Sequence, residues 1–152
     1  MKITFQNGMT VVSLRPPGRI NNPYLNKSLL QNLDPKGPGT YEYEVVGESH
    51  YQKELNRICG GRTYEGHEKT VQARLIHDDN NPHDAQAVRI EIEGLTVGHL
   101  NRDDARNYRK QLADSGNPGI DAVCSAIIVG GWDRGDGDTG YFGVKLDIPT
   151  IE

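Results

Sequence analysis

The sequence predicts a mainly β protein: a small, mostly antiparallel barrel or an α+β domain, with about six strands and two connecting helices. Segments that alternate apolar and polar residues recur along the chain, and only two stretches have helical spacing. Glycine is abundant, at 18 of 152 residues, which favours turns and short strands over long helices. The length is that of one domain and suffices for a hydrophobic core.

Charge and composition divide the chain near residue 40. Residues 1–40 hold five Lys or Arg and one acid, whereas residues 41–152 hold 12 Lys or Arg and 20 Asp or Glu. The first 14 residues predict a β-hairpin around the Asn7-Gly8 turn, and Pro and Gly are too dense in 15–40 for regular structure. We therefore expect an N-terminal arm and linker over 1–40 and a folded domain over 41–152.

Six segments of the domain have patterns typical of strands. In five of them apolar residues have polar neighbours along the chain, and the other one is apolar on both faces. The expected strands are 43–47, 70–76, 87–93, 96–100, 122–129 and 141–148. In the last of them, alternation places Phe142, Val144, Leu146 and Ile148 inward. The last two strands are joined by the segment 133–140, which is rich in Asp and Gly. None of its glycines stands at the position where a calcium loop requires one, so the segment predicts a wide hairpin loop.

Two helices are expected in the connections. Gln52–Cys59 carries apolar residues on one face and ends at Gly60-Gly61. Asn101 should cap the second helix, which Gly116 and Pro118 end. Its buried face is expected to hold Ala105, Tyr108 and Leu112.

Composition argues against several classes of protein. The net charge of −4 and pI near 5.7 argue against broad electrostatic binding to nucleic acid or to an anionic membrane. No apolar run approaches the ~18 residues of a membrane span, and the N-terminus has no apolar signal-peptide region. Cys59 and Cys124 make no disulfide framework and fit inert thiols of a reduced, cytoplasmic protein.

The densest polar cluster, His77-Asp78-Asp79-Asn80-Asn81-Pro82-His83-Asp84, lies between two expected strands. One interpretation is a plain surface loop, because Asn, Asp and Pro are what a loop uses to bond its own backbone. The other is a rim that presents His83 and Asp84 to a ligand. A metal bound by His77, His83, His99 and Asp84 is a further alternative, although the spacing matches no familiar metal site.

Three motifs follow one another along the chain: Val46-Gly47-Glu48-Ser49-His50-Tyr51, then Asp79-Asn80-Asn81-Pro82-His83-Asp84 with Ala87-Val88, then Val97-Gly98-His99-Leu100. Their order and spacing resemble the HIRAN domain family. That family has a glycine followed by aromatics, an N-P-[aromatic]-D-x-x-A segment, and an [IV]-G-[HY]-[IL] segment before a helix. Its members occur at the N-termini of SWI/SNF-type DNA translocases and, in bacteria, as small near-stand-alone proteins.

The resemblance implies an OB-like barrel that binds single-stranded DNA and holds its 3′ end. Asp84 would accept a hydrogen bond from the 3′-hydroxyl, rings would stack on the last bases, and His99 and Arg102 would contact phosphate. The DNA-binding residues that it implies are His50, Tyr51, Asn81, His83, Asp84, His99, Arg102 and Phe142, with Tyr141 as an alternative to Phe142. Ser49 and His83 stand where some members have a basic residue and a tyrosine, which lowers the expected affinity.

We therefore expect a non-catalytic module for single-stranded DNA ends, acting in DNA repair or replication-fork processing with a separate helicase or nuclease chain. It should need no metal or cofactor and contact no membrane. One alternative is a protein-interaction barrel that has lost DNA binding, suggested by the acidic domain and its few cations. The other is a metal-dependent hydrolase that uses His83, His99 and Asp84.

Overall fold

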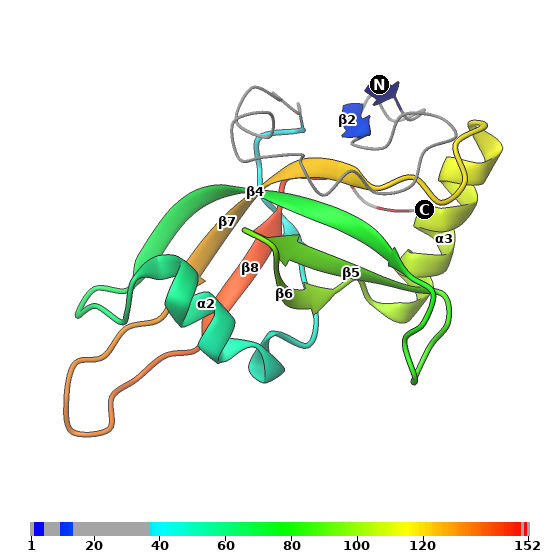
Figure 1. Ribbon diagram of the computed structural model, residues 1–152. Coiled ribbons are helices and arrows are strands. Elements are labelled where there is room, and N and C mark those ends of the chain that lie inside the picture. Colours follow the sequence, from blue (N-terminus) through cyan, green and yellow to red (C-terminus); the bar gives the residue numbers. More distant parts are fainter. Residues whose placement is uncertain (1, 5–9, 14–36, 150, 152) are drawn as a thin grey trace.

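Six antiparallel strands curl into a half-barrel, which confirms the mainly β fold predicted from the sequence (Figure 1). The computed structural model describes residues 2–4, 10–13, 37–149 and 151. The six strands are β3 (Tyr43–Glu44), β4 (His67–Asp78), β5 (Ala87–Ile92), β6 (Leu95–His99), β7 (Ala122–Gly130) and β8 (Phe142–Leu146).

The sheet runs in the order β7-β4-β5-β6, and β8 pairs with the other edge of β7 and with β3. Val46, two residues after β3, forms an antiparallel bridge with His99 of β6. Two backbone hydrogen bonds of 2.9 Å make this bridge. It joins the two ends of the curled sheet, so β3 lies next to β8 while the residues after it lie next to β6.

Two further strands, β1 (Lys2–Thr4) and β2 (Thr10–Ser13), form an antiparallel pair, and β2 pairs with β7. The pairing agrees with the predicted N-terminal hairpin, whose Asn7-Gly8 turn lies outside the described residues, as does most of the predicted linker. The end of that linker contacts the domain: the Gly39 N–H donates to the Asp147 carboxylate at 2.7 Å.

Both predicted helices are confirmed. α2 (Gln52–Cys59) ends at Gly60, whose φ of 76° is the left-handed conformation that glycine adopts readily. α3 (Arg102–Asp114) is capped by Asn101, whose side chain accepts from the Asp104 N–H at 2.8 Å. A short 3₁₀ turn, η1 (Glu48–His50), precedes α2. None of the described helices is long and apolar enough to cross a membrane.

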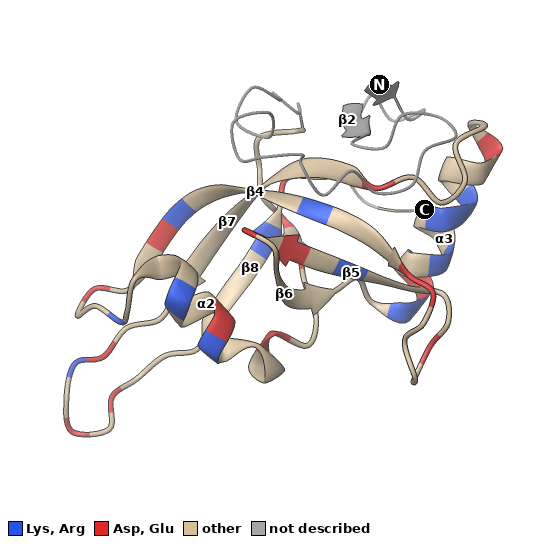
Figure 2. Cartoon of the chain, in the orientation of Figure 1, with Lys and Arg blue, Asp and Glu red and all other residues tan. Residues whose placement is uncertain are grey.

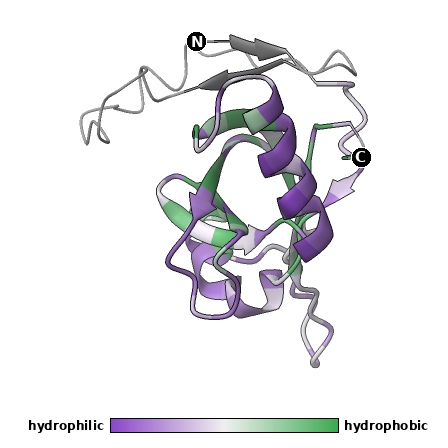
Figure 3. Cartoon of the chain, turned by 90° about the vertical axis from the view of Figure 1, so that its right-hand side faces the viewer, coloured by the Kyte–Doolittle hydropathy of each residue, from purple (hydrophilic) through white to green (hydrophobic). Residues whose placement is uncertain are grey.

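The hydrophobic core lies between the inner faces of the strands and the two α-helices. Figure 3 shows α3 as largely hydrophilic, whereas hydrophobic residues gather on the strands beside it. The largest fully buried side chains include Leu55, Leu75, Ile90, Tyr108, Leu112, Phe142 and Leu146. The inward positions expected for α3 and for the last strand are therefore confirmed.

Two side chains complete the edge of β8 where β3 ends. The Gln52 amide pairs with the backbone of Phe142 in both directions, donating to its carbonyl at 3.0 Å and accepting from its N–H at 2.8 Å. The Glu48 carboxylate accepts from the Val144 N–H at 3.0 Å. Burial raises the pKa of Glu48, and the Val144 hydrogen bond partly opposes this. These contacts hold η1 and the start of α2 against β8, which fixes the position of Tyr51 between them.

Candidate functional site

The first and third motifs lie side by side because Gly98 has no side chain. A Cβ at Gly98 would lie 2.3 Å from Val45 Cγ1 and 2.8 Å from the Val46 carbonyl oxygen. The close approach permits the bridge between Val46 and His99. It also brings the Tyr51 ring to 6.1 Å from the His99 ring, centroid to centroid, with an angle of 46° between their planes.

Asn81 organises the loop between β4 and β5, which contains the second motif. Its side-chain amide donates to Asp78 at 3.0 Å, and its side-chain oxygen accepts from the backbone N–H groups of His83 and Asp84 at 2.8 and 3.1 Å. This is the self-bonded loop that Asn and Asp are expected to make. It also fixes the backbone from which the His83 and Asp84 side chains project. A loop that bonds its own backbone can therefore also present these two side chains to a ligand.

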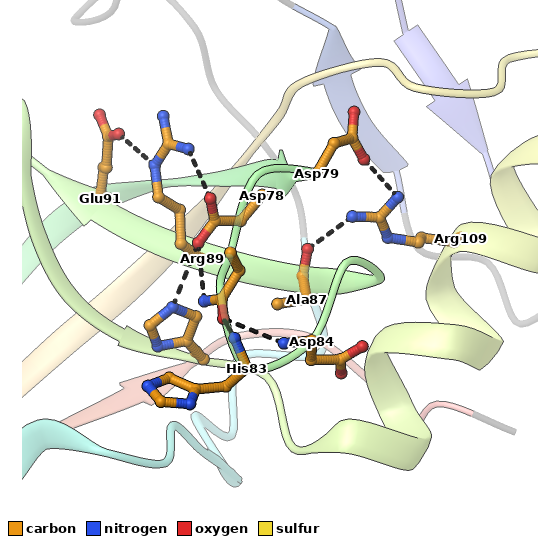
Figure 4. A network of polar contacts seen from close by, with 10 residues as sticks. Asp78, Asp79, His83, Asp84, Ala87, Arg89, Glu91 and Arg109 are labelled. Carbon is orange, nitrogen blue, oxygen red and sulfur yellow. Dashed lines mark hydrogen bonds and ion pairs between the residues drawn. The ribbon is translucent and has the colours of Figure 1, made fainter.

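Asp78 connects this loop to His99. One carboxylate oxygen lies 3.6 Å from His99 Nε2, an ion pair when the imidazole is protonated. The other lies 3.5 Å from the Arg89 guanidinium (Figure 4). Arg89 in turn donates to Glu91 at 2.8 Å. The third motif is thereby held against the second by a chain of polar contacts that Asn81 also joins.

Asp84 lies beneath two arginines of α3. Arg106 donates to both carboxylate oxygens at 3.2 and 3.3 Å, and Arg102 Nε lies 3.7 Å from one of them. The Asp84 side chain is 14% exposed, whereas those of Arg106 and Arg102 are 42% and 67% exposed. The hydrogen bond from the Gln86 N–H lowers the pKa of Asp84; burial opposes this, and Arg106 and Arg102 add to the lowering. Asp84 is therefore an ionised carboxylate with its charge balanced.

Arg109 makes a second connection between α3 and the same loop. It donates to Asp79 at 2.8 Å and to the Ala87 carbonyl at 2.6 Å (Figure 4). Figure 2 shows the basic residues of α3 close to the acidic residues of the β4–β5 loop. Arg106 and Arg109 were not among the expected site residues. Their spacing of four and seven residues from Arg102, which places all three on one helix face, is the signal that identifies them.

The structure brings most of the expected residues to this region but arranges them in two groups. Tyr51 and His99 form one group, in which His99 also contacts Asp78. Asp84 of the β4–β5 loop and Arg102 of α3 form the other. Asn81 bonds to both, while the His83 ring and the Asp84 carboxylate point in different directions (Figure 4). His50 is exposed at the end of η1.

Phe142 belongs to the core rather than to this region. It is 1% exposed, and its ring stacks on that of His67 with centroids 5.5 Å apart. A buried ring offers no face to a base, so Phe142 is not part of the candidate site. Tyr141 is well exposed but belongs to the loop between β7 and β8.

Within the described ranges, no three His, Cys, Asp or Glu side chains are grouped closely enough to hold a metal ion. The set of His77, His83, His99 and Asp84 is therefore not assembled. Burial raises the pKa of both cysteine thiols, Cys59 and Cys124, as expected of unreactive core residues.

Comparisons with protein-family models, curated proteins and solved structures found no match to this chain. The resemblance to the HIRAN family therefore rests on the three motifs.

Proposed function

We propose that this chain is a non-catalytic module that binds single-stranded DNA at its 3′-hydroxyl end. The observation that supports this proposal most is the meeting of the three motifs, which are separated along the chain but lie in contact around Asn81 and His99. The binding surface would consist of Tyr51, the turn 81–84, His99 and Arg102. The module would serve DNA repair or replication-fork processing together with a separate helicase or nuclease chain.

With respect to the described residues, the Asp84 carboxylate has one position left for a hydroxyl donor. Oδ1 accepts from the Gln86 N–H and from Arg106, and Oδ2 accepts from Arg106. The remaining contact of Oδ2, to Arg102 at 3.7 Å, is too long for a hydrogen bond. Since each carboxylate oxygen accepts two hydrogen bonds, Oδ2 can receive one from the 3′-hydroxyl. Arg106 then acts as a positioning residue, because it fixes the orientation of that carboxylate.

Arg102 is the cation best placed to contact phosphate. It is the most exposed of the three arginines of α3 that contact the loop, and it is held less tightly than Arg106. A guanidinium binds two phosphate oxygens in a planar fork, so a small rotation of Arg102 away from Asp84 would let both residues bind the same nucleotide. Because few cationic side chains of the described residues lie beside this surface, the affinity for DNA should depend weakly on salt concentration, as for about two or three phosphate contacts.

The rings of Tyr51, His83 and His99 would supply the stacking surface. Stacking of a base on an aromatic side chain contributes about 1–3 kcal/mol with little preference for sequence. Histidine offers a smaller ring for stacking than tyrosine, so two histidines among three rings predict weak binding.

A second candidate function is a protein-interaction barrel without DNA binding. The pairing of charges on α3 favours it, because Arg102 and Arg106 share an ion pair with Asp84, and Arg109 pairs with Asp79. This leaves little positive potential to attract a nucleic acid.

Fluorescence anisotropy with 5′-labelled oligothymidine, ending in either a 3′-hydroxyl or a 3′-phosphate, distinguishes the two functions. We expect the hydroxyl end to bind several-fold more tightly, the preference to disappear in Asp84→Ala, and Arg102→Gln to weaken both. Lys110→Gln is the matched control, since Lys110 is exposed on the same helix and pairs only with Asp114 in the structure described. Equal binding of both ends, unchanged in Asp84→Ala, contradicts end recognition. Absence of binding at low salt favours the protein-interaction barrel.

A further inference from the structure

A second surface lies at the opposite end of the sheet from the β4–β5 loop. It is formed by the segment 60–66 and the loop 131–141 between β7 and β8, which projects at the lower left of Figure 1. Tyr64 and Tyr141 are 68% and 74% exposed there, and only one other large hydrophobic residue, Val46, is exposed among the described residues. Tyrosine is enriched at interfaces, so two exposed tyrosines on neighbouring segments make this end of the sheet a candidate interaction surface.

Backbone hydrogen bonds hold the two segments together. The Thr63 N–H donates to the Gly131 carbonyl at 3.2 Å, and the Gly131 N–H donates to the Tyr141 carbonyl at 3.2 Å. Thr63 also forms a parallel bridge with Trp132. The aromatic residues thus project from a fixed scaffold, which lowers the entropy that a ligand must overcome on binding.

The rings of this surface already accept a guanidinium. The Arg134 Cζ lies 5.7 Å from the centre of the Tyr64 ring and 5.2 Å from that of Trp132, within the range of a cation–π interaction. Gly140 packs against the Trp132 ring so closely that a Cβ would lie 2.4 Å from it. Tyr141 takes part in no ring contact with a described residue, so its faces stay open.

The charge of the loop 131–141 indicates which kind of partner this surface can bind. Residues 131–141 contain three exposed acids, Asp133, Asp136 and Asp138, and one base, Arg134. Asp138 is used within the loop, since it accepts from the Trp132 indole N–H at 3.2 Å and lies 3.9 Å from Arg134. Among the described residues, the Asp133 carboxylate accepts only from the Gly135 N–H, so it and the Asp136 carboxylate can each take a cation. Acids beside rings repel phosphates and favour a cationic side chain.

We propose that Tyr64 and Tyr141, with Asp133 and Asp136, bind an arginine-containing segment of a partner protein. The guanidinium groups of the segment stack on the exposed parts of the two tyrosine rings, in the way that Arg134 stacks on Tyr64 and Trp132, and pair with the two aspartates. This inference is independent of DNA binding at the other end of the sheet. Together the two surfaces would let the module bring a protein partner to a DNA end.

Two-dimensional amide NMR spectra of the full chain test the proposal by titration with three probes. The first is a short Gly/Ser peptide with several arginines, the second is the same peptide with citrulline replacing arginine, and the third is oligothymidine. Citrulline keeps the shape of arginine without its charge. We expect the arginine peptide to shift the amides of 62–66 and 131–141, and the citrulline peptide to leave them unchanged.

Substitutions of the rings and acids on this surface should each weaken binding of the arginine peptide. Tyr64→Ala and Tyr141→Ala should each weaken it by about 2- to 5-fold, the factor for one exposed cation–π contact. Asp136→Asn should weaken it as well, while His83→Ala, on the other surface, should not. Three results would overturn the proposal: no shifts at millimolar peptide, equal shifts with citrulline, or shifts of the same amides by oligothymidine. Because Tyr141 makes no ring contact with a described residue, its variant should fold even if Tyr64→Ala does not.

Discussion

Replacing Gly98 by alanine tests how closely β6 approaches the segment after β3. The added Cβ would lie 2.3 Å from Val45 Cγ1 and 2.8 Å from the Val46 carbonyl oxygen. The shorter of these distances is about 1 Å less than an ordinary van der Waals contact. The Val45 side chain is buried and the second clash involves backbone, so neither neighbour moves freely. Overpacking of this kind costs about 1–3 kcal/mol. For a chain of this size that lowers Tm by about 2–12 °C.

Thermal unfolding followed by circular dichroism measures this loss, and amide hydrogen exchange shows where it occurs. The His99 and Val46 amides should exchange faster, because the clash lies at the bridge they form. Thr96→Ala is the matched control on β6, since it removes atoms and adds none. An unchanged Tm in Gly98→Ala, or a loss no larger than that of Thr96→Ala, would refute the close approach on which the site geometry depends.

Three further predictions concern single side chains. Tyr43→Phe should lower the free energy of unfolding by about 1–3 kcal/mol in a denaturant titration, because it removes a 2.6 Å hydrogen bond to the Asp104 carboxylate. Glu48→Gln should raise Tm slightly near pH 7 and have no effect near pH ~4. Burial raises the pKa of Glu48, so its ionised form weakens the fold, and this cost grows as pH rises through that pKa. The pKa of Asp84 is lowered, so its contribution is present above pH ~4 and is lost as pH falls below that. Asp84→Asn should accordingly reduce the acid sensitivity of hydrogen exchange in the β4–β5 loop.

The strands and helices could be predicted from local pattern, but the lengths of some strands could not. Alternation identified 70–76 as a strand, yet β4 extends over His67–Asp78. Pairing with β7 supports the residues before the alternating stretch, and pairing with β5 supports those after it. The expected strand at 43–47 is reduced to Tyr43–Glu44. Beyond this short strand, the side chains of Glu48 and Gln52 accept hydrogen bonds from the backbone of β8. The bonded residues are 96 and 90 positions apart, so no local pattern reveals these contacts.

The candidate site shows a similar division. The motifs identified the loop that contains Asn81 and Asp84. The side chain of Asn commonly hydrogen-bonds the backbone of a turn, and the carboxylate of Asp can accept a hydrogen bond from a ligand. Arg106 was missed because a basic residue on a helix face is usually solvated, and only the fold places Asp84 beneath it. Phe142 received two incompatible predictions, a core position from alternation and a stacking role from the resemblance, and its burial supports the first.

Competition between linear and circular DNA tests the proposed function most directly. A 5′-labelled oligothymidine with a 3′-hydroxyl is bound to the protein and then challenged with the same strand unlabelled, either linear or closed into a circle. The linear strand should displace the label at the concentration expected for equal affinity, and the circle, which has the same bases and phosphates but no end, should fail to do so. Displacement by the circle at the same concentration as the linear strand would contradict recognition of a 3′ end by Asp84 and its neighbours.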